Sequence, residues 1–261
     1  MPKKVSIILR THSGADVHPG RRALAVSKPE LIAGCLKSLV CSIAQVDRIR
    51  FAIRLSVIDD HSEVSCVNEI RQILDRAPFQ TEFLPLVDTG VGAALKASFE
   101  LARDNPSDLI YFVEDDYLHA PSALAEMLEA QDFFSQKLGG TEVAIFPVDY
   151  PSNYDPRIIR PSYLVLGPKR HWHTDFSTTG TFFISKKAYL ANIEHCMRLT
   201  QYKIDPLIDE GNTINRIWTD GGVRLFSPVP TLAIHMQDEE SMPRYIDWRE
   251  WWNQYSRPNL S

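Results

Sequence analysis

The chain has 261 residues, of which 44% are hydrophobic and 23% charged, and its formal net charge is -5. This length can bury a sizeable core, and the apolar fraction is that of a globular protein, which excludes a disordered chain. The 33 acidic residues against 28 basic ones argue against a protein that binds nucleic acid, because such proteins normally carry a basic excess.

Short apolar strands alternate with helices in the first part of the chain. Strands are expected over 5–9, 53–58, 81–87 and 109–113, and helices over 31–43, from 63 towards 78, and over 90–103. Ser27 and Glu30 have the spacing of a capping box, which places the start of the first helix. The strands lack strict polar–apolar alternation, which is typical of a parallel sheet covered on both faces. In such a fold, ligands bind at the carboxyl ends of the strands.

The rest of the chain is less regular. Helices are expected over 121–137, 186–200 and 209–218, and strands over 143–148, 177–185 and 225–235. Pro228 and Pro230 interrupt the last strand, as they would in an edge strand or a bent one. In the tail, Trp248, Trp251 and Trp252 share one helical face. Packing of the tail onto the body is favoured over stacking on a sugar ring.

The cysteines and the apolar runs indicate the cellular compartment of the protein. The four cysteines, at positions 35, 41, 66 and 196, form neither a zinc pattern nor a dense disulfide framework. They are typical of buried thiols in a reducing compartment, although a Cys35–Cys41 pair stays open. The apolar runs are too short for a signal peptide or a membrane span. We therefore expect a cytoplasmic protein with, at most, peripheral contact to a membrane.

Three adjacent carboxylates, Glu114, Asp115 and Asp116, follow the fourth strand directly. Their mutual repulsion falls when a divalent cation lies between them. Mg²⁺ and Mn²⁺ bind one or two carboxylates together with phosphate oxygens and water. The alternative is a solvated turn before a helix, where acidic side chains favour the helix dipole. The position at the carboxyl end of a strand favours the metal site.

Other polar side chains also end strands. Arg10, Thr11 and His12 follow the first strand and Asp60 follows the second, where a nucleobase, ribose or phosphate would lie. A turn that closes the strand explains Asp60 equally well. His235 ends the last expected strand, and it becomes a metal ligand only if the fold returns it to the carboxylates.

Asp209 and Glu210 lie at the start of the helix expected over 209–218. Either carboxylate could act as a general base, which needs reach and a suitable pKa. Stabilisation of the helix N-terminus is the alternative. The sequence lacks a GxGxxG fingerprint, a P-loop, a GxSxG nucleophile elbow and an HExxH motif, so the chemistry associated with these motifs is unsupported.

Taken in chain order, these segments resemble the GT-A-fold glycosyltransferases of family 2. The closer matches are to the family's opening strand, its DDxS motif, its third helix and its DXD-type segment, at residues 5–12, 56–62, 90–99 and 111–117. Looser matches are to the acidic base motif and to the late strand that carries a histidine, at residues 209–217 and 233–237.

The resemblance implies how a nucleotide sugar would be held. Asp60 would contact the base, and Asp115 would lie near the ribose and the donor sugar. The third helix carries residues beside the diphosphate, here Lys96. Residues 10–12 would complete the nucleotide site.

The resemblance also implies a metal site and a catalytic base. Asp116 and His235 would hold Mn²⁺ or Mg²⁺. Glu210, which the downstream Arg-Ile spacing favours over Asp209, would take the proton from the acceptor hydroxyl. The transfer would proceed with inversion at the anomeric carbon.

The fold implied is α/β, with a GT-A-type, mostly parallel central sheet flanked by helices and a smaller mixed region on the acceptor side. One domain would span 1–261, with a nucleotide-sugar-binding half over 1–120 and an acceptor-binding half and tail over 121–261. The expected donor is a UDP sugar, and the expected acceptor is a glycan or a glycolipid.

Two other functions stay open. A sugar-phosphate nucleotidyltransferase also combines a doubly wound sheet with a divalent metal. That class expects a glycine-rich basic loop after the first strand, which Gly14, Gly20, Arg21 and Arg22 imitate only faintly. The second alternative is a catalytically inactive module that binds a nucleotide or a sugar.

Overall fold

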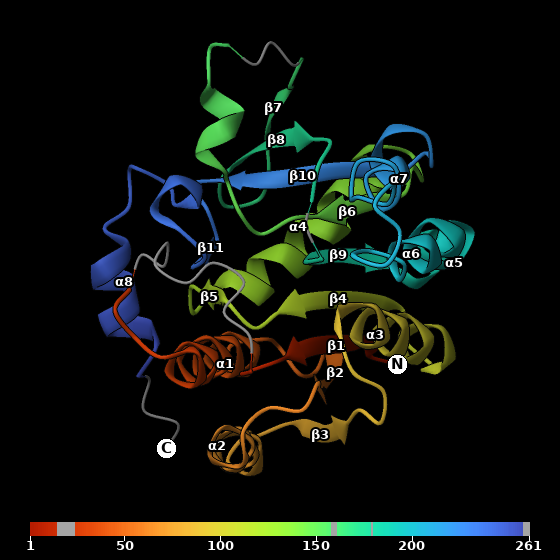
Figure 1. Cartoon of the computed structure of the whole chain (residues 1–261). Coiled ribbons are helices and arrows are strands. Elements are labelled where there is room, and N and C mark those ends of the chain that lie inside the picture. Colours follow the sequence, from red (N-terminus) through yellow and green to blue (C-terminus); the bar gives the residue numbers. More distant parts are fainter. Residues whose placement is uncertain (15–23, 158–160, 179, 258–261) are drawn as a thin grey trace.

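A nine-stranded sheet forms the centre of the protein. The computed structural model describes residues 1–14, 24–157, 161–178 and 180–257. The strand order within them is β3-β2-β1-β4-β9-β6-β10-β8-β7 (Figure 1). The first four strands in this order are parallel: β1 (Lys3–Thr11), β2 (Phe51–Asp59), β3 (Gln80–Pro85) and β4 (Leu109–Glu114). These strands confirm the parallel half of the sheet that the sequence predicts.

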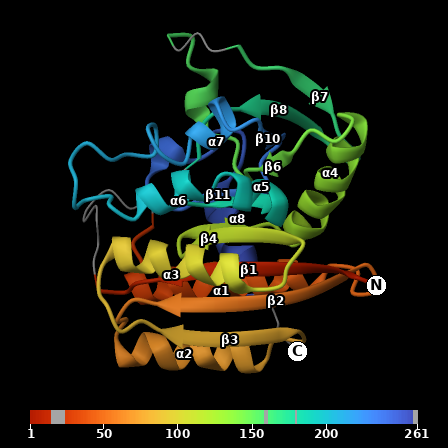
Figure 2. The same cartoon turned by 90° about the vertical axis from the view of Figure 1, so that its right-hand side faces the viewer.

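Helices cover both faces of the parallel half. α1 (Lys28–Ala44) and α2 (Val64–Asp75) lie on one face, and α3 (Val91–Asp104) lies on the other (Figure 2). α1 begins with the expected capping box, because the Ser27 hydroxyl accepts the Glu30 N–H and the Glu30 carboxylate accepts the Ser27 N–H. Successive strand residues such as Ile7 and Ile8 are both fully buried, which explains why the strands do not alternate.

The second half of the sheet is mixed. It contains β9 (Phe182–Ser185), β6 (Val143–Ile145), β10 (Arg224–Val229), β8 (His171–Asp175) and β7 (Leu164–Leu166). β9 runs antiparallel to both β4 and β6, whereas β10 is parallel to β6 and antiparallel to β8. α4 (Ala123–Lys137) packs against α1 and β6, and α3 packs against α5 (Lys186–Ala191) and α6 (Ile193–Leu199). The change from parallel to mixed pairing therefore occurs at β4, where the acidic cluster lies.

A small separate sheet joins the two halves of the chain. β5 (Tyr117–His119) pairs antiparallel with β11 (Ala233–His235), which brings His235 opposite Tyr117. Because Tyr117 directly follows the acidic cluster, this pairing returns His235 to the carboxylates. The strand expected over 225–235 is therefore two strands in two different sheets.

Two further expectations about the second half were wrong in detail. The helix expected over 209–218 is formed only from Arg216, where α7 (Arg216–Thr219) begins. Before it, the Asp209 and Asn212 side chains accept backbone N–H groups and stabilise turns. The helix expected over 186–200 is divided at Asn192. Pro228, expected in an edge strand or a bent one, lies where β10 pairs with β8 but no longer with β6, so no ladder bond from β6 is lost there.

The tail packs onto the body, as favoured from its tryptophans. In α8 (Trp248–Tyr255), Trp248 and Trp252 are buried, and they cluster with Leu31 of α1. Gly34 of α1 permits this packing, since a Cβ there would lie 2.4 Å from the Trp252 ring. Two 3₁₀ turns complete the described elements, η1 (Pro151–Tyr154) and η2 (Glu239–Ser241).

The state of the cysteines and the length of the helices can be compared with the sequence. All four cysteines are free, and three of them are buried. Within the described residues, every helix is too short or too polar to cross a membrane.

Candidate active site

The acidic cluster lies at the carboxyl end of β4, beside the carboxyl ends of β1 and β2. The register places Arg10 next to Glu114 and Thr11 next to Asp59. The strand-end residues that the sequence predicts to converge are therefore neighbours. The three carboxylates of the cluster nevertheless have different partners.

Asp115 is held by a backbone group and by a lysine. Its carboxylate accepts the His12 N–H at 2.9 Å and forms an ion pair with Lys28 Nζ at 2.5 Å. Burial alone would lower the pKa of Lys28, but the charges of Asp115 and Asp116 outweigh it and raise that pKa. Lys28 therefore stays charged and partly neutralises the acidic cluster.

Lys28 belongs to the candidate active site through its ion pair with Asp115, although no sequence motif indicated it. It is the first residue of α1, which the capping box at Ser27 and Glu30 locates correctly. A helix that follows a parallel strand can begin near the carboxyl end of that strand. This placement is the signal that could have pointed to the lysine.

Asp116 faces His235. Asp116 Oδ2 lies 3.3 Å from His235 Nε2, and both side chains are largely buried. Although burial opposes both charges, mutual attraction lowers the pKa of Asp116 and raises the pKa of His235. The other carboxylate oxygen, Asp116 Oδ1, is buried and has no hydrogen-bond partner. An orphaned carboxylate oxygen of this kind is costly unless a cation or donor meets it.

The His235 ring is held in position by two tyrosines. Its Nδ1 shares a hydrogen bond with the Tyr150 hydroxyl at 2.7 Å, and the Tyr117 ring stacks on it with 4.6 Å between ring centroids. A partner on Nδ1 fixes the ring so that Nε2 points to Asp116, as in many metal sites. Burial raises the pKa of Tyr150, so its hydroxyl keeps its proton.

These residues fit a divalent cation that the protein binds through only part of its ligand shell. The orphaned Asp116 Oδ1 and the adjacent His235 Nε2 offer two ligands of suitable chemistry. Among the described residues, no group of three or more His, Cys, Asp or Glu side chains could hold a metal. Such a site is typical of Mg²⁺ or Mn²⁺ that keeps phosphate and water ligands rather than of a closed protein cage.

Arg10 pairs with the first carboxylate of the cluster. Arg10 Nη2 lies 3.2 Å from Glu114 Oε1, and the Gly180 N–H donates to Glu114 Oε2 at 3.1 Å. Gly180 allows this close approach, because a Cβ there would lie 2.1 Å from Arg10 Nη2 and would displace it. Arg10 and Glu114 thus fasten the loop before β9 to the end of β4.

The second strand ends in a hydrogen-bonded corner. The Thr11 hydroxyl donates to buried Asp59, and the His12 ring bonds through Nδ1 to the Asp60 carbonyl at 2.5 Å. The Asp60 carboxylate accepts the Gly90 N–H at 2.9 Å. Gly90 has a φ of 100°, which favours glycine. Asp60 therefore positions the start of α3.

The remaining predicted residues lie further out. Lys96 is exposed on α3, and Asp209 is exposed with its carboxylate accepting the Asn212 N–H. Glu210 is half-buried. Burial first, and then the charges of Glu210, Glu114 and Asp209, raise the pKa of Tyr202. The basic pair Arg21-Arg22 and Gly20 lie outside the described residues.

A pocket of about 550 Å³ opens next to His235. Tyr150, which bonds to His235, lines it together with Tyr154 and Phe176. Asp175 also lines it and accepts hydrogen bonds from Asn153, Ser227 and two backbone N–H groups. Aromatic faces beside fixed polar groups suit a ring-shaped polar ligand.

The arrangement of the strands and helices identifies the class of fold. Parallel strands flanked by helices, a mixed second half and a strand-end acidic cluster make up the GT-A fold, as the sequence predicted. No protein-family profile matches this sequence, and no curated protein is significantly similar to it.

Solved structures that share this fold include the following two. S. aureus TarS 1-349 matches 86% of this chain and 60% of its own, with 12% identity and a TM-score of 0.51. The mannosyltransferase PcManGT from Pyrobaculum calidifontis, in complex with GDP-Man and Mn²⁺, matches 98% of this chain and 62% of its own, with 14% identity and a TM-score of 0.53. This chain therefore spans less than two thirds of either protein, and at such identity the likeness shows the fold alone.

Proposed function

We propose that the protein is a metal-dependent glycosyltransferase that transfers a sugar from a UDP sugar to a hydroxyl of a glycan or glycolipid. The observation that carries the proposal is the buried, unpaired Asp116 Oδ1 beside His235 at the carboxyl end of β4. The GT-A fold supports it, and a mannosyltransferase with this fold was solved with GDP-Man and Mn²⁺.

Mn²⁺ or Mg²⁺ held by Asp116 and His235 would stabilise the negative charge that grows on the leaving nucleoside diphosphate. Lys28 adds a fixed positive charge next to Asp115, which would lower the repulsion between the acidic cluster and an anionic donor. Asp115 would then accept hydrogen bonds from the ribose and donor sugar.

The nucleotide-binding half would consist of residues 1–120. Residues 10–12 and Asp60 would border the base, and Lys96 would lie beside the diphosphate. Tight hydrogen bonds among these strand ends support the assignment, because a nucleotide site needs groups that are already held in place.

The acceptor-binding half would consist of residues 121–261. The pocket lined by Tyr150, Tyr154 and Phe176 is our candidate for the acceptor sugar, since it adjoins His235 through Tyr150. An acceptor in this pocket would lie close to the donor end of the site.

We propose Glu210 as the base that takes the acceptor proton. Attack of the hydroxyl on the anomeric carbon, opposite the leaving diphosphate, would give inversion. Asp175 lines the pocket, but four hydrogen bonds occupy its oxygens, and those lone pairs are the ones that a base needs. Asp209 is engaged in a turn, which also favours Glu210.

Calorimetric titration with UDP in the presence of Mn²⁺ tests the metal assignment. We expect wild type to bind and Asp116→Ala to bind at least about tenfold more weakly, a loss of about 1.4 kcal/mol, because one metal ligand is gone. Asp75→Ala, at the exposed end of α2, is the matched control and should bind as wild type does. Undiminished binding by Asp116→Ala would rule the assignment out.

Glu210→Gln tests the base separately. The amide keeps the size of the side chain but cannot take a proton, so UDP binding should stay and sugar transfer should be lost. The measurement is nucleoside diphosphate release together with UDP calorimetry. Turnover near the wild-type rate would move the base to Asp175 or Asp209.

A further inference from the structure

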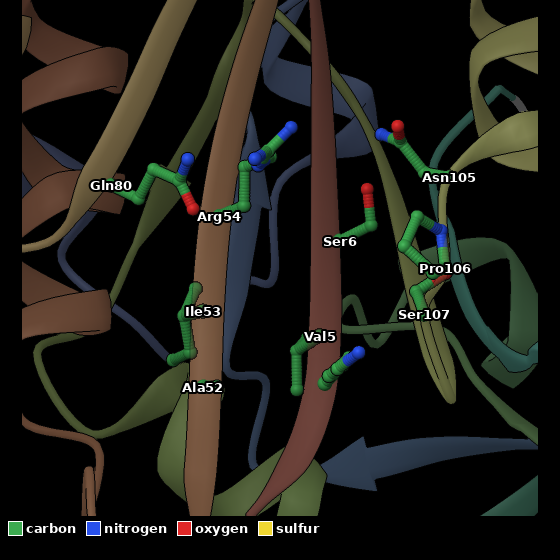
Figure 3. Close-up of a pocket in the computed structure, with 10 residues that line it drawn as sticks. Val5, Ser6, Ala52, Ile53, Arg54, Gln80, Asn105, Pro106 and Ser107 are labelled. Atoms are coloured by element: carbon green, nitrogen blue, oxygen red, sulfur yellow. The ribbon is translucent and has the colours of Figure 1, made fainter.

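A second pocket lies on the face of the sheet that α3 covers, beyond the end of that helix. It has a volume of about 240 Å³ and is lined by residues of β1 and β2, the first residue of β3, and the segment that follows α3 (Figure 3). The register aligns Ser6 with Arg54 and Arg54 with Gln80. Aligned residues of parallel strands share a face, so these three side chains form one row across the floor of the pocket.

Three polar atoms at this pocket lack hydrogen-bond partners. They are Ser6 Oγ, Asn105 Nδ2 and Ser107 Oγ, all buried. The Ser6 residue is only 3% exposed, and Figure 3 shows its hydroxyl directed towards the neighbouring Asn105 amide. Each unpaired buried group costs about 1–3 kcal/mol. A ligand that supplies hydrogen-bond acceptors to all three groups would therefore bind with a more favourable free energy than a ligand that contacts only one of them.

The charge of the lining indicates the sign of that partner. Lys4 and Arg54 are among the ten lining residues, and none of the ten is acidic. Arg54 Nη1 lies 3.9 Å from Glu82 Oε1, which is too far for a hydrogen bond. The Glu82 carboxylate already accepts the Ser56 hydroxyl. Asp108, near Lys4, accepts the Lys4 backbone N–H. The Arg54 guanidinium thus keeps most of its donors for another ligand.

We propose that this pocket binds a small phosphate-bearing anion. A phosphate presents several acceptor oxygens in different directions, which matches a guanidinium, an amide and two hydroxyls arranged around one space. The volume admits inorganic phosphate or a sugar phosphate. Both ligands carry the phosphate group that the pocket would recognise.

The site is separate from the candidate active site. Asp60, the acidic cluster and His235 lie at the carboxyl ends of their strands, whereas this pocket is lined by Lys4 and Val5 at the start of β1 and by Gln80 at the start of β3. An anion bound here would not overlap a nucleotide at the other end of the sheet. Its binding should therefore be independent of UDP, and the proposal stands whether or not the protein transfers sugars.

Calorimetric titration of the whole protein with inorganic phosphate, and then with glucose 6-phosphate, tests the proposal in metal-free buffer. Wild type should show one saturable site. Arg54→Gln and Asn105→Ala should each weaken binding at least about tenfold, because each removes a donor to the anion. Arg76→Gln, another exposed arginine of the same half, should bind as wild type does. Added UDP should leave phosphate binding unchanged.

Three results would overturn the proposal. They are the absence of saturable binding by wild type, binding that Arg54→Gln leaves unchanged, and a crystal structure grown in phosphate that shows only water at Ser6 and Asn105. Arg54 is partly exposed, so its substitution is compatible with folding. Equal melting temperatures of the variants and wild type would exclude a loss of binding caused by unfolding.

Discussion

Neighbouring carboxylates of identical chemistry acquire different tasks from their partners. Each Asp115 oxygen has a partner, Lys28 Nζ or the His12 N–H, whereas Asp116 has one oxygen near His235 and one oxygen unpaired. Only the second arrangement leaves a carboxylate able to accept a cation. The division of roles between the two aspartates therefore follows from what surrounds them, not from the order of the acidic residues.

The ion pair between Lys28 and Asp115 should matter for stability. Lys28→Met leaves a largely buried carboxylate without its cation, so we expect a loss of about 2 kcal/mol in the free energy of unfolding. Lys37→Met breaks a more exposed pair with Glu69 and should cost no more than about 0.5 kcal/mol. Urea unfolding at pH 7 measures both. Equal losses in the two variants would show that Lys28 is not effectively buried.

At the scale of elements, the pairing of β5 with β11 assembles the site. It brings His235 to Asp116 from more than a hundred residues away. The pair is anchored by His119, whose ring is fully buried. His119 Nδ1–H donates to the Tyr117 carbonyl at 3.0 Å, so Nε2 is left to accept from the Tyr111 hydroxyl at 2.7 Å. Full burial of the ring favours this neutral form.

The neutral His119 ring predicts a pH dependence of stability. Burial lowers its pKa from 6.5 to about 4. As the pH falls through 6.5 the unfolded chain takes up a proton that the folded ring refuses, so stability is lost between pH 6.5 and pH 4. We expect this group to cost roughly 2 kcal/mol between pH 7 and pH 5.

Denaturant unfolding at both pH values measures this dependence. His119→Gln should lose less stability than wild type over the same interval. His171→Gln, an exposed control on β8, should lose as much as wild type. A wild-type pH profile in His119→Gln would mean that other groups cause the loss.

At the scale of the whole molecule, the parallel half was predictable because its signals are local. Apolar runs, the capping box at Ser27 and the polar strand ends indicated the strands, the helices and the adjacency of Arg10 and Glu114. Lys28 was missed because its contact with Asp115 depends on how α1 is placed against the sheet. The turns around Asp209 were missed because side-chain bonds to the backbone compete with a helical pattern.

The binding of a nucleotide sugar with a metal tests the central claim most directly. A thermal-shift screen of UDP and GDP sugars, with and without Mn²⁺, is the measurement. At a hundredfold excess over Kd, ligand binding adds about 2.7 kcal/mol of stability, which corresponds to a rise of about 5 °C or more in Tm for a chain of this size. We predict such a rise with a UDP sugar only when Mn²⁺ is present. No rise with any nucleotide sugar, or an equal rise without metal, would contradict the account.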